Sequence, residues 1–120
     1  MGLDSYFVLK DKETNEVIEY SYYRKFNALQ GYFVLNHNIQ NCGRVQITTE
    51  ILNDLYKKMN SIRNHPENAS AALPVFFGPF FGSYEYDDLY FSQLHRCSLD
   101  LYHAKFLDYN RYELFYSSDW

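Results

Sequence analysis

The sequence has no long apolar run, few cysteines and no excess of positive charge. No stretch approaches the roughly 18 to 20 consecutive apolar residues that cross a bilayer, and the opening MGLDSYFVLKDKE lacks the basic and apolar segments of a secretory signal. The formal net charge of −4 disfavours the broad basic face that binding to duplex nucleic acid requires. We therefore expect a cytoplasmic protein with no membrane and no duplex nucleic-acid partner, in which Cys42 and Cys97 are reduced thiols.

The sequence also lacks the short motifs that identify most catalytic and metal sites. It contains no HExxH, no GxSxG, no zinc spacing, no dinucleotide fingerprint and no phosphate-binding GxxxxGK. Asp88, His95 and His103 have a spacing that a helix could place on one face, although exposed helical histidines are the commoner explanation. We expect no catalytic residue, no metal and no cofactor, and we interpret the chain as a non-enzyme. A phosphodiesterase built on these three residues is the enzymatic alternative.

Aromatic residues are the unusual feature that is present. Thirteen tyrosines, ten phenylalanines and Trp120 make up 20% of the 120 residues. Tyrosine combines an apolar ring with a hydroxyl that needs a partner, so such an excess is typical of interfaces and ligand-binding walls. Codon bias in an AT-rich genome explains the same excess without any function. The length fits one domain, residues 1–120, and the balance of 47% apolar and 22% charged residues is that of a folded chain.

The hydrophobic periodicity predicts a fold in which strands and helices are segregated. Short β-prone runs near both ends flank segments with helical spacing. In chain order we expect a strand at 5–10, a turn at DKETNE, a strand at 16–23, a helix at 24–38, a short extended piece in NCGRVQI, a helix capped by Thr48 or Thr49 that runs to about residue 62, a loop, a helix at 84–108 and a strand at RYELFYS. This order predicts the α+β class: a small antiparallel sheet, made of the N-terminal hairpin plus the C-terminal strand, packed by about three helices.

A basic pair follows a run of tyrosines at residues 20–27, YSYYRKFN. Arg24 and Lys25 stand at the expected start of a helix, where free backbone N–H groups also attract anions. Tyr22 or Tyr23 is suited to stack on a base, and Asn27 to hydrogen-bond with a base edge. The segment therefore has the parts of a phosphate-plus-base site, although a solvated helix start beside sheet tyrosines gives the same pattern.

Residues 73–90, LPVFFGPFFGSYEYDDLY, join glycine-separated phenylalanines to tyrosines and acids. Gly78 and Gly82 permit close backbone approach, and Ser83 is a good cap for the following helix. The acids after Ser83 would repel a phosphate, so the segment predicts an aromatic wall whose acids accept from a guanine edge or pair with Arg24. A hydrophobic plug before an ordinary capped helix is the alternative. The expected ligand-binding residues are Tyr6, Tyr22, Tyr23, Arg24, Lys25, Asn27, Phe81, Gly82, Ser83, Tyr86, Asp87 and Tyr90.

Several segments in a fixed order resemble a family of small phage proteins. Members of that family begin MGLDxY, continue YWRKxN and later carry FFFGSxxYDxxY. This chain has MGLDSY at its start, YYRKFN at 22–27, CG at 42–43 and FFGSYEYDDLY at 80–90, so the match covers most of its length. It departs from the pattern in Tyr23, where tryptophan is usual, and in Pro79, shortly before FFGS. The tyrosine keeps a ring that is able to stack.

The resemblance extends to the phage anti-CBASS sponges, which sequester the cyclic dinucleotide signals of bacterial immunity. It implies a non-catalytic homo-oligomer, a tetramer or dimer, that binds a signal such as 3′3′-cGAMP without hydrolysis and so blocks CBASS anti-phage defence in the infected bacterial host cell. A sponge needs stackable rings and cations for two phosphates, which the tyrosines and the Arg24–Lys25 pair supply. The alternative is a small phage protein that inhibits a host enzyme by direct protein–protein binding, which acidity and exposed aromatics also fit.

Overall fold

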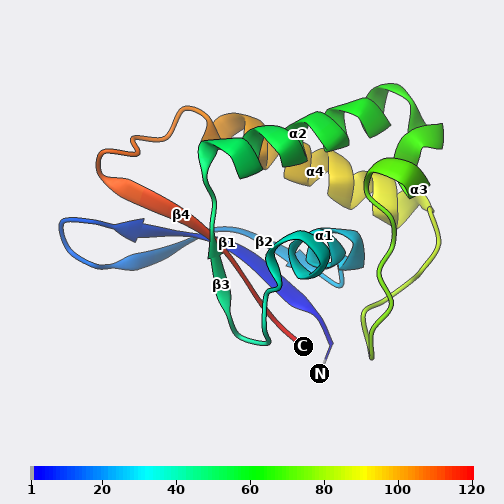
Figure 1. The fold of residues 1–120 in the computed structure, drawn as a ribbon, viewed down its shortest axis with the longest axis horizontal. Coiled ribbons are helices and arrows are strands. Elements are labelled where there is room, and N and C mark those ends of the chain that lie inside the picture. The colour runs from blue at the N-terminus through cyan, green and yellow to red at the C-terminus, as the bar shows by residue number, and fades with distance from the viewer. Residues whose placement is uncertain (1) are drawn as a thin grey trace.

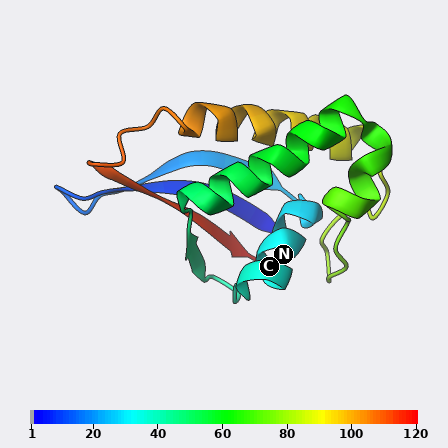
Figure 2. The same ribbon diagram turned by 45° about the horizontal axis from the view of Figure 1, so that its top comes forward.

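The computed structural model describes residues 2–120 as an antiparallel sheet with helices packed on it. The strands are β1 (Asp4–Asp11), β2 (Val17–Arg24), β3 (Arg44–Gln46) and β4 (Tyr112–Asp119). The helices are α1 (Asn27–His37), α2 (Thr49–Asn64), α3 (Ala69–Ala72) and α4 (Asp88–Ala104), with a 3₁₀ turn at Pro66–Asn68. The order across the sheet is β2-β1-β4-β3. The first and last strands are therefore neighbours, and the two ends of the chain lie side by side (Figures 1 and 2).

The predicted α+β class is confirmed. The strands β1 and β2 form the expected hairpin, and β4 joins it from the C-terminus. The short extended piece is the fourth strand of the sheet, because Arg44–Gln46 pairs with β4 as an edge strand. The loop expected after α2 contains the 3₁₀ turn and α3, so residues 2–120 hold four α-helices where about three were expected. The last helix ends at Ala104 rather than at residue 108.

One face of the sheet forms the core. Phe7 on β1 and Tyr116 on β4 are register partners and are almost fully buried. Phe33 of α1 stacks on Tyr116 with the ring centroids 3.9 Å apart and meets Phe7 edge-on. Within this core the Tyr116 hydroxyl is hydrogen-bonded to Ser5 Oγ and Gln30 Oε1. Because side chains alternate along a strand, the even-numbered positions of β1 lie on the other, partly exposed face.

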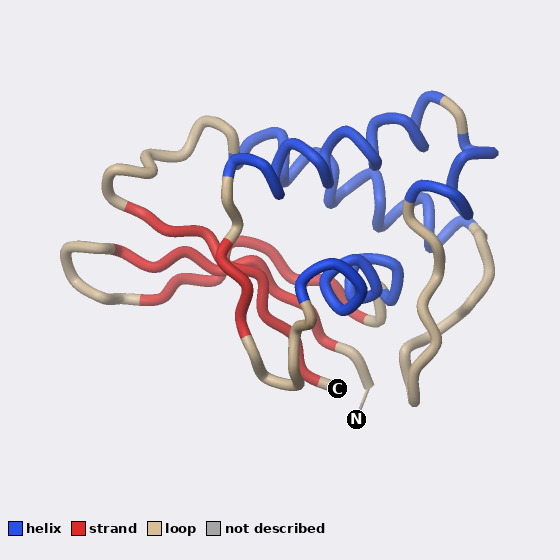
Figure 3. Tube along the Cα trace, in the orientation of Figure 1, coloured by secondary structure: helices blue, strands red, loops and turns tan. Residues whose placement is uncertain are grey.

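The two long helices α2 and α4 lie side by side over the core (Figures 1 and 3). Each buries one apolar stripe, as the periodicity predicts. The buried stripes are Leu52, Leu55, Met59 and Ile62 on α2, and Tyr90, Leu94, Cys97 and Leu101 on α4. The side chain of Thr48 caps α2 by accepting from the Ile51 N–H, which confirms one of the two expected caps. None of the helices within residues 2–120 is both long and apolar enough to cross a membrane.

The starts of two helices near the expected site differ from the prediction. Helix α1 begins at Asn27 rather than at residue 24, because Lys25 has a positive φ of 54° that interrupts helical geometry. Helix α4 begins at Asp88 rather than at residue 84, because the capping side chain is that of Asp87 and not that of Ser83; the Asp87 carboxylate accepts from a first-turn N–H at 3.0 Å. The segment between α3 and α4 is therefore a long loop, and Figure 1 shows it hanging below the helices as a narrow yellow-green projection.

Candidate functional site

A groove open to solvent lies where the edge strand β2 meets α4. It has a volume of about 210 Å³ and is lined by Tyr22, Arg24, Leu89, Ser92, Gln93 and Arg96. The strand supplies the first two residues. The helix supplies the other four at positions i, i+3, i+4 and i+7, which share one helix face. None of these lining side chains is acidic.

Side chains of α4 cover the outer edge of β2 and thereby build the groove. Gln93 Nε2 donates to the Arg24 carbonyl at 2.7 Å, and Arg96 Nη2 donates to the Tyr22 carbonyl at 2.5 Å. An edge strand without such cover presents unpaired carbonyls to other chains. The two hydrogen bonds therefore protect the edge of the sheet and fix the opposing walls of the groove.

The two arginines of the groove are held in different ways. Arg24 Nη1 lies 2.7 Å from Asp4 Oδ1, which also accepts from the Tyr22 hydroxyl. The hydrogen bond from Tyr22 and, second in size of effect, the contact with Arg24 hold the pKa of the Asp4 carboxyl below its usual value. The carboxylate therefore stays charged and offsets part of the Arg24 charge. The Arg96 guanidinium lies 4.6 Å from the centre of the Tyr23 ring, a cation–π contact. Arg24 is therefore held by a carboxylate, whereas Arg96 is held by an aromatic ring.

Of the two tyrosines expected to stack, one lines the groove and the other lies beneath it. Tyr22 is 38% exposed, and its ring is supported by Tyr6 with centroids 5.1 Å apart. Tyr23 is fully buried, and its hydroxyl donates to Asp100; burial raises the pKa of this phenol. Tyr22 therefore offers a ring to a ligand, whereas Tyr23 forms the floor on which Arg96 lies and does not face solvent.

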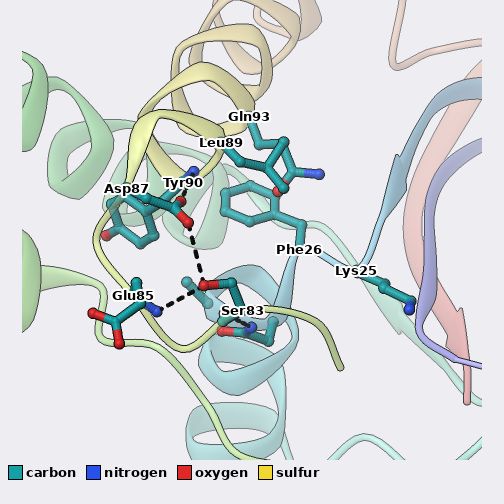
Figure 4. A pocket seen from close by; sticks show the side chains of 10 residues that line it. Lys25, Phe26, Ser83, Glu85, Asp87, Leu89, Tyr90 and Gln93 are labelled. Carbon is teal, nitrogen blue, oxygen red and sulfur yellow. Dashed lines mark hydrogen bonds between the residues drawn. The ribbon is translucent and has the colours of Figure 1, made fainter. Parts of the chain in front are cut away.

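A second, much smaller hollow of about 20 Å³ adjoins the groove and shares two helical residues with it. Figure 4 shows its acidic side, where Ser83 Oγ donates to Asp87 Oδ2 and accepts from the Glu85 N–H. The side chain of Lys25 points away from both carboxylates in this view. Phosphate would meet uncompensated negative charge here, so this hollow suits a hydrogen-bond donor better than an anion.

Asn27 holds the loop before α4 in place. Its amide nitrogen donates to the carbonyls of Phe81 (3.2 Å) and Ser83 (2.8 Å), and its amide oxygen accepts from the Phe76 N–H (3.0 Å). The residue is only 4% exposed. Because both amide hydrogens and the amide oxygen are already engaged, Asn27 clamps the loop and is not available to bind a base edge.

The remaining expected residues shape the loop and the second hollow rather than the groove. Phe81 is buried, and Gly82 has a φ of 93° and lies so close to Lys25 that an added Cβ would be 2.9 Å from the Lys25 Cβ. Tyr86 is partly exposed and its hydroxyl accepts from a loop N–H. Tyr90 is buried and its hydroxyl donates to a loop carbonyl. The sequence therefore placed these residues near the site but not in the groove.

The helical wall of the groove was missed by the sequence reasoning. Leu89, Ser92, Gln93 and Arg96 lie on the face of α4 opposite to much of its apolar stripe, where a polar stripe is normally read as solvated. The sequence signal that could have indicated this wall is a single arginine, Arg96, on a helix with acids on either side of it. It could not be used without knowing that β2 runs along this helix, because that contact joins residues 74 positions apart.

The residues proposed for an enzymatic alternative do not meet in space. Asp88, His95 and His103 all lie on α4 and are exposed. At a rise of about 1.5 Å per residue they are spaced roughly 10 and 12 Å apart along the helix axis. Among residues 2–120 no group of three or more His, Cys, Asp or Glu side chains is placed to hold a metal ion.

Comparisons with known proteins do not assign the chain to a family. No protein-family model, no curated protein and no solved structure matches the chain. The resemblance to small phage proteins therefore rests on the sequence motifs, and the function must be argued from the groove.

Proposed function

We propose that the protein binds a cyclic dinucleotide such as 3′3′-cGAMP in the groove between β2 and α4 and holds it without hydrolysis. In an infected bacterial cell, a phage protein of this kind would lower the free signal concentration and so block CBASS defence. The observation that carries the proposal is that two arginines, Arg24 and Arg96, and the partly exposed Tyr22 line one groove.

Each part of such a ligand has a matching group. A guanidinium binds phosphate oxygens through two parallel N–H donors, and Arg96 is positioned for this by its contact with the Tyr22 carbonyl. Tyr22 stacks on a base, which contributes about 1–3 kcal/mol in single-stranded nucleic-acid sites. Ser92 and Gln93 supply polar groups beside the arginines, and the 55% exposed Leu89 supplies an apolar contact.

The size of the groove favours an assembly over an isolated chain. Its volume of about 210 Å³ lies below the roughly 300–1,000 Å³ that small-molecule sites occupy, and the groove is open on one side. A ligand with near two-fold symmetry is enclosed if two grooves face each other. The proposal therefore includes a homo-oligomer, a dimer or tetramer, as the form that retains the signal.

The test measures thermal stabilisation across a panel of cyclic and linear nucleotides and then analyses the released ligand by chromatography. A ligand present at about 100 times its dissociation constant adds roughly 2.7 kcal/mol to the free energy of unfolding. We expect stabilisation by a cyclic dinucleotide and its recovery intact after heat denaturation. Recovery of a cleaved product would contradict sequestration and indicate phosphodiesterase activity instead.

Matched variants assign the effect to the groove. Arg96→Gln removes a cation from the groove and Tyr22→Ala removes its ring, and each is expected to weaken binding by about tenfold or more. Arg44→Gln is the control, because Arg44 also lies over a ring, at 5.7 Å from Phe115, but on β3 at the opposite edge of the sheet. Equal loss in all three variants, or no stabilisation by any nucleotide, contradicts the proposal. If a pull-down from host lysate captures a host protein in stoichiometric amount and nucleotides have no effect, the alternative function, inhibition of a host enzyme, is supported.

A further inference from the structure

The loop before α4 carries exposed aromatic rings at its tip. We call residues 76–84 the finger. Phe77 is 70% exposed and Phe80 is 63% exposed, and no residue from 68 to 84 is charged. Isolated exposed apolar residues are ordinary, but a contiguous uncharged patch of rings marks an interaction site. The groove proposed above uses none of these residues.

The finger is held rigidly, so its rings are presented in a fixed arrangement. The Tyr84 hydroxyl donates to the Gly78 carbonyl at 2.7 Å and accepts from the Gly78 N–H at 3.3 Å. The Phe81 N–H closes the tip by donating to the same carbonyl at 3.2 Å. Asn27 clamps the base through three hydrogen bonds. Because little ordering is needed on binding, little conformational entropy is lost when the rings are covered.

A hollow lies directly beside the finger. It has a volume of about 120 Å³, and its lining joins the apolar Leu35, Ala72, Pro74, Val75 and Phe76 to the polar Asn36 and Lys58. Phe76 packs so tightly on α1 that an added Cβ on Gly31 would be 2.6 Å from its Cβ. Leu35 is 69% exposed at the rim. The base of the finger thus forms one wall of the hollow, and the exposed ring of Phe77 follows Phe76 directly in the chain.

We propose that this face is a self-association surface, in which two copies of the chain insert their fingers into each other's hollows about a two-fold axis. A projection next to a matching hollow is self-complementary, which is the requirement for an isologous interface. Each copy places Phe77 and Phe80 against the partner's hollow, at whose rim Leu35 lies.

The exposed area is sufficient for such a dimer. A fully buried aromatic side chain covers about 150–250 Å², so four phenylalanine rings, two from each copy and each about two-thirds exposed, supply on the order of 400–650 Å². The partner surface that covers these rings, of which the hollows are a part, is about as large as the ring surface it covers. The total approaches the roughly 1,000 Å² of a specific protein–protein interface.

The charges around the finger favour a second copy over a lipid surface. Glu67 and Glu85 flank the uncharged stretch on its two sides, and Asp87 and Asp88 follow. A loop that inserts into a membrane is normally bordered by lysine and arginine, which anionic headgroups attract. Here carboxylates border the stretch in the sequence, and Lys25 packs against Gly82 within the finger. This mixture of both signs differs from the cationic border of a membrane-inserting loop, whereas at a protein interface such charges remain at the solvated rim.

The experiment measures the molar mass of the full chain by light scattering and sedimentation over a wide concentration range. The wild type is expected to be a dimer or a larger even-numbered oligomer. The double variant Phe77→Ser with Phe80→Ser is expected to raise the dimer dissociation constant by at least about thirtyfold while keeping its thermal melt, because both rings are exposed. Phe106→Ser is the matched control, since Phe106 is 73% exposed outside this face.

A mixing experiment tests the reciprocal arrangement. Leu35→Asp places a charge at the rim of the hollow and is expected to be monomeric, as is the finger variant. A mixture of the two retains one intact finger facing one intact hollow, so it is expected to form heterodimers. A monomeric wild type, an unchanged mass in both variants, or wild-type binding to phosphatidylcholine vesicles through the finger rings overturns the proposal. Nucleotide binding is measured separately on the same variants, so the two proposals fail independently.

Discussion

Replacing Asn27 by alanine tests whether this one side chain holds the loop before α4. The substitution removes hydrogen bonds to two carbonyls and one N–H and leaves the buried carbonyl of Phe81 without its partner. A hydrogen bond contributes about 0.5–1.5 kcal/mol net, and an unsatisfied buried group costs about 1–3 kcal/mol. Only one of the three partners is fully buried, so we expect a loss of about 2–3 kcal/mol in the free energy of unfolding and a fall in Tm on the order of 10 °C.

The assay combines urea denaturation with hydrogen exchange. Asn36→Ala is the control, because Asn36 also lies on α1 but is exposed and bonds only to the carbonyl of Tyr32; a change below about 0.5 kcal/mol is expected for it. In Asn27→Ala the Phe76 amide should also exchange faster. A loss for Asn27→Ala no larger than that of the control, with unchanged exchange at Phe76, would refute the clamp.

Three further predictions concern the core and one ion pair. In the native protein a thiol reagent should modify Cys42 rapidly and Cys97 only after unfolding, because Cys97 is fully buried and burial raises its pKa to about 12. Tyr116→Phe should lower the free energy of unfolding by about 1–3 kcal/mol in urea titrations, since two buried polar atoms lose their partner. Asp4, whose folded pKa lies below its unfolded value of roughly 3.9, stabilises above that pH and loses this contribution as the pH falls through its folded pKa. Urea titrations should therefore show Asp4→Asn less stable by up to about 1 kcal/mol near neutral pH and equal to the wild type in acid.

The parts of the fold that were predictable rest on local periodicity. Alternation in the terminal strands and the apolar stripes of α2 and α4 each follow from spacing within one segment. The strand β3 did not, because a piece of three residues is defined only by its pairing with β4. The start of α4 was misplaced because Ser83 and Asp87 are both good caps, and the choice between them depends on how the loop packs.

The site was only half predictable for a related reason. The run at 20–27 pointed to Tyr22 and Arg24 because rings and cations adjacent in the sequence are visible without a fold. Arg96 was missed because its role depends on α4 lying along β2. Tyr23 was included because neighbouring strand residues cannot be assigned to a face until the sheet's core is known; its neighbour Tyr22 points the other way. The resemblance and the proposed ligand stay predictions.

Residues 23–27, which run from the end of β2 to the first residue of α1, position both proposed surfaces. The two surfaces are nevertheless held by different contacts. The groove depends on α4, whose Arg96 and Gln93 bond to the carbonyls of β2, while the finger depends on Asn27. The positive φ of Lys25 separates the two, because it turns the chain between them. A loosened clamp should therefore disturb the finger and leave the groove walls in place. Asn27→Ala is expected to weaken self-association while each groove still binds nucleotide, less tightly than the enclosed site of an oligomer, and complete loss of both would show that the groove of one chain is not a binding site by itself.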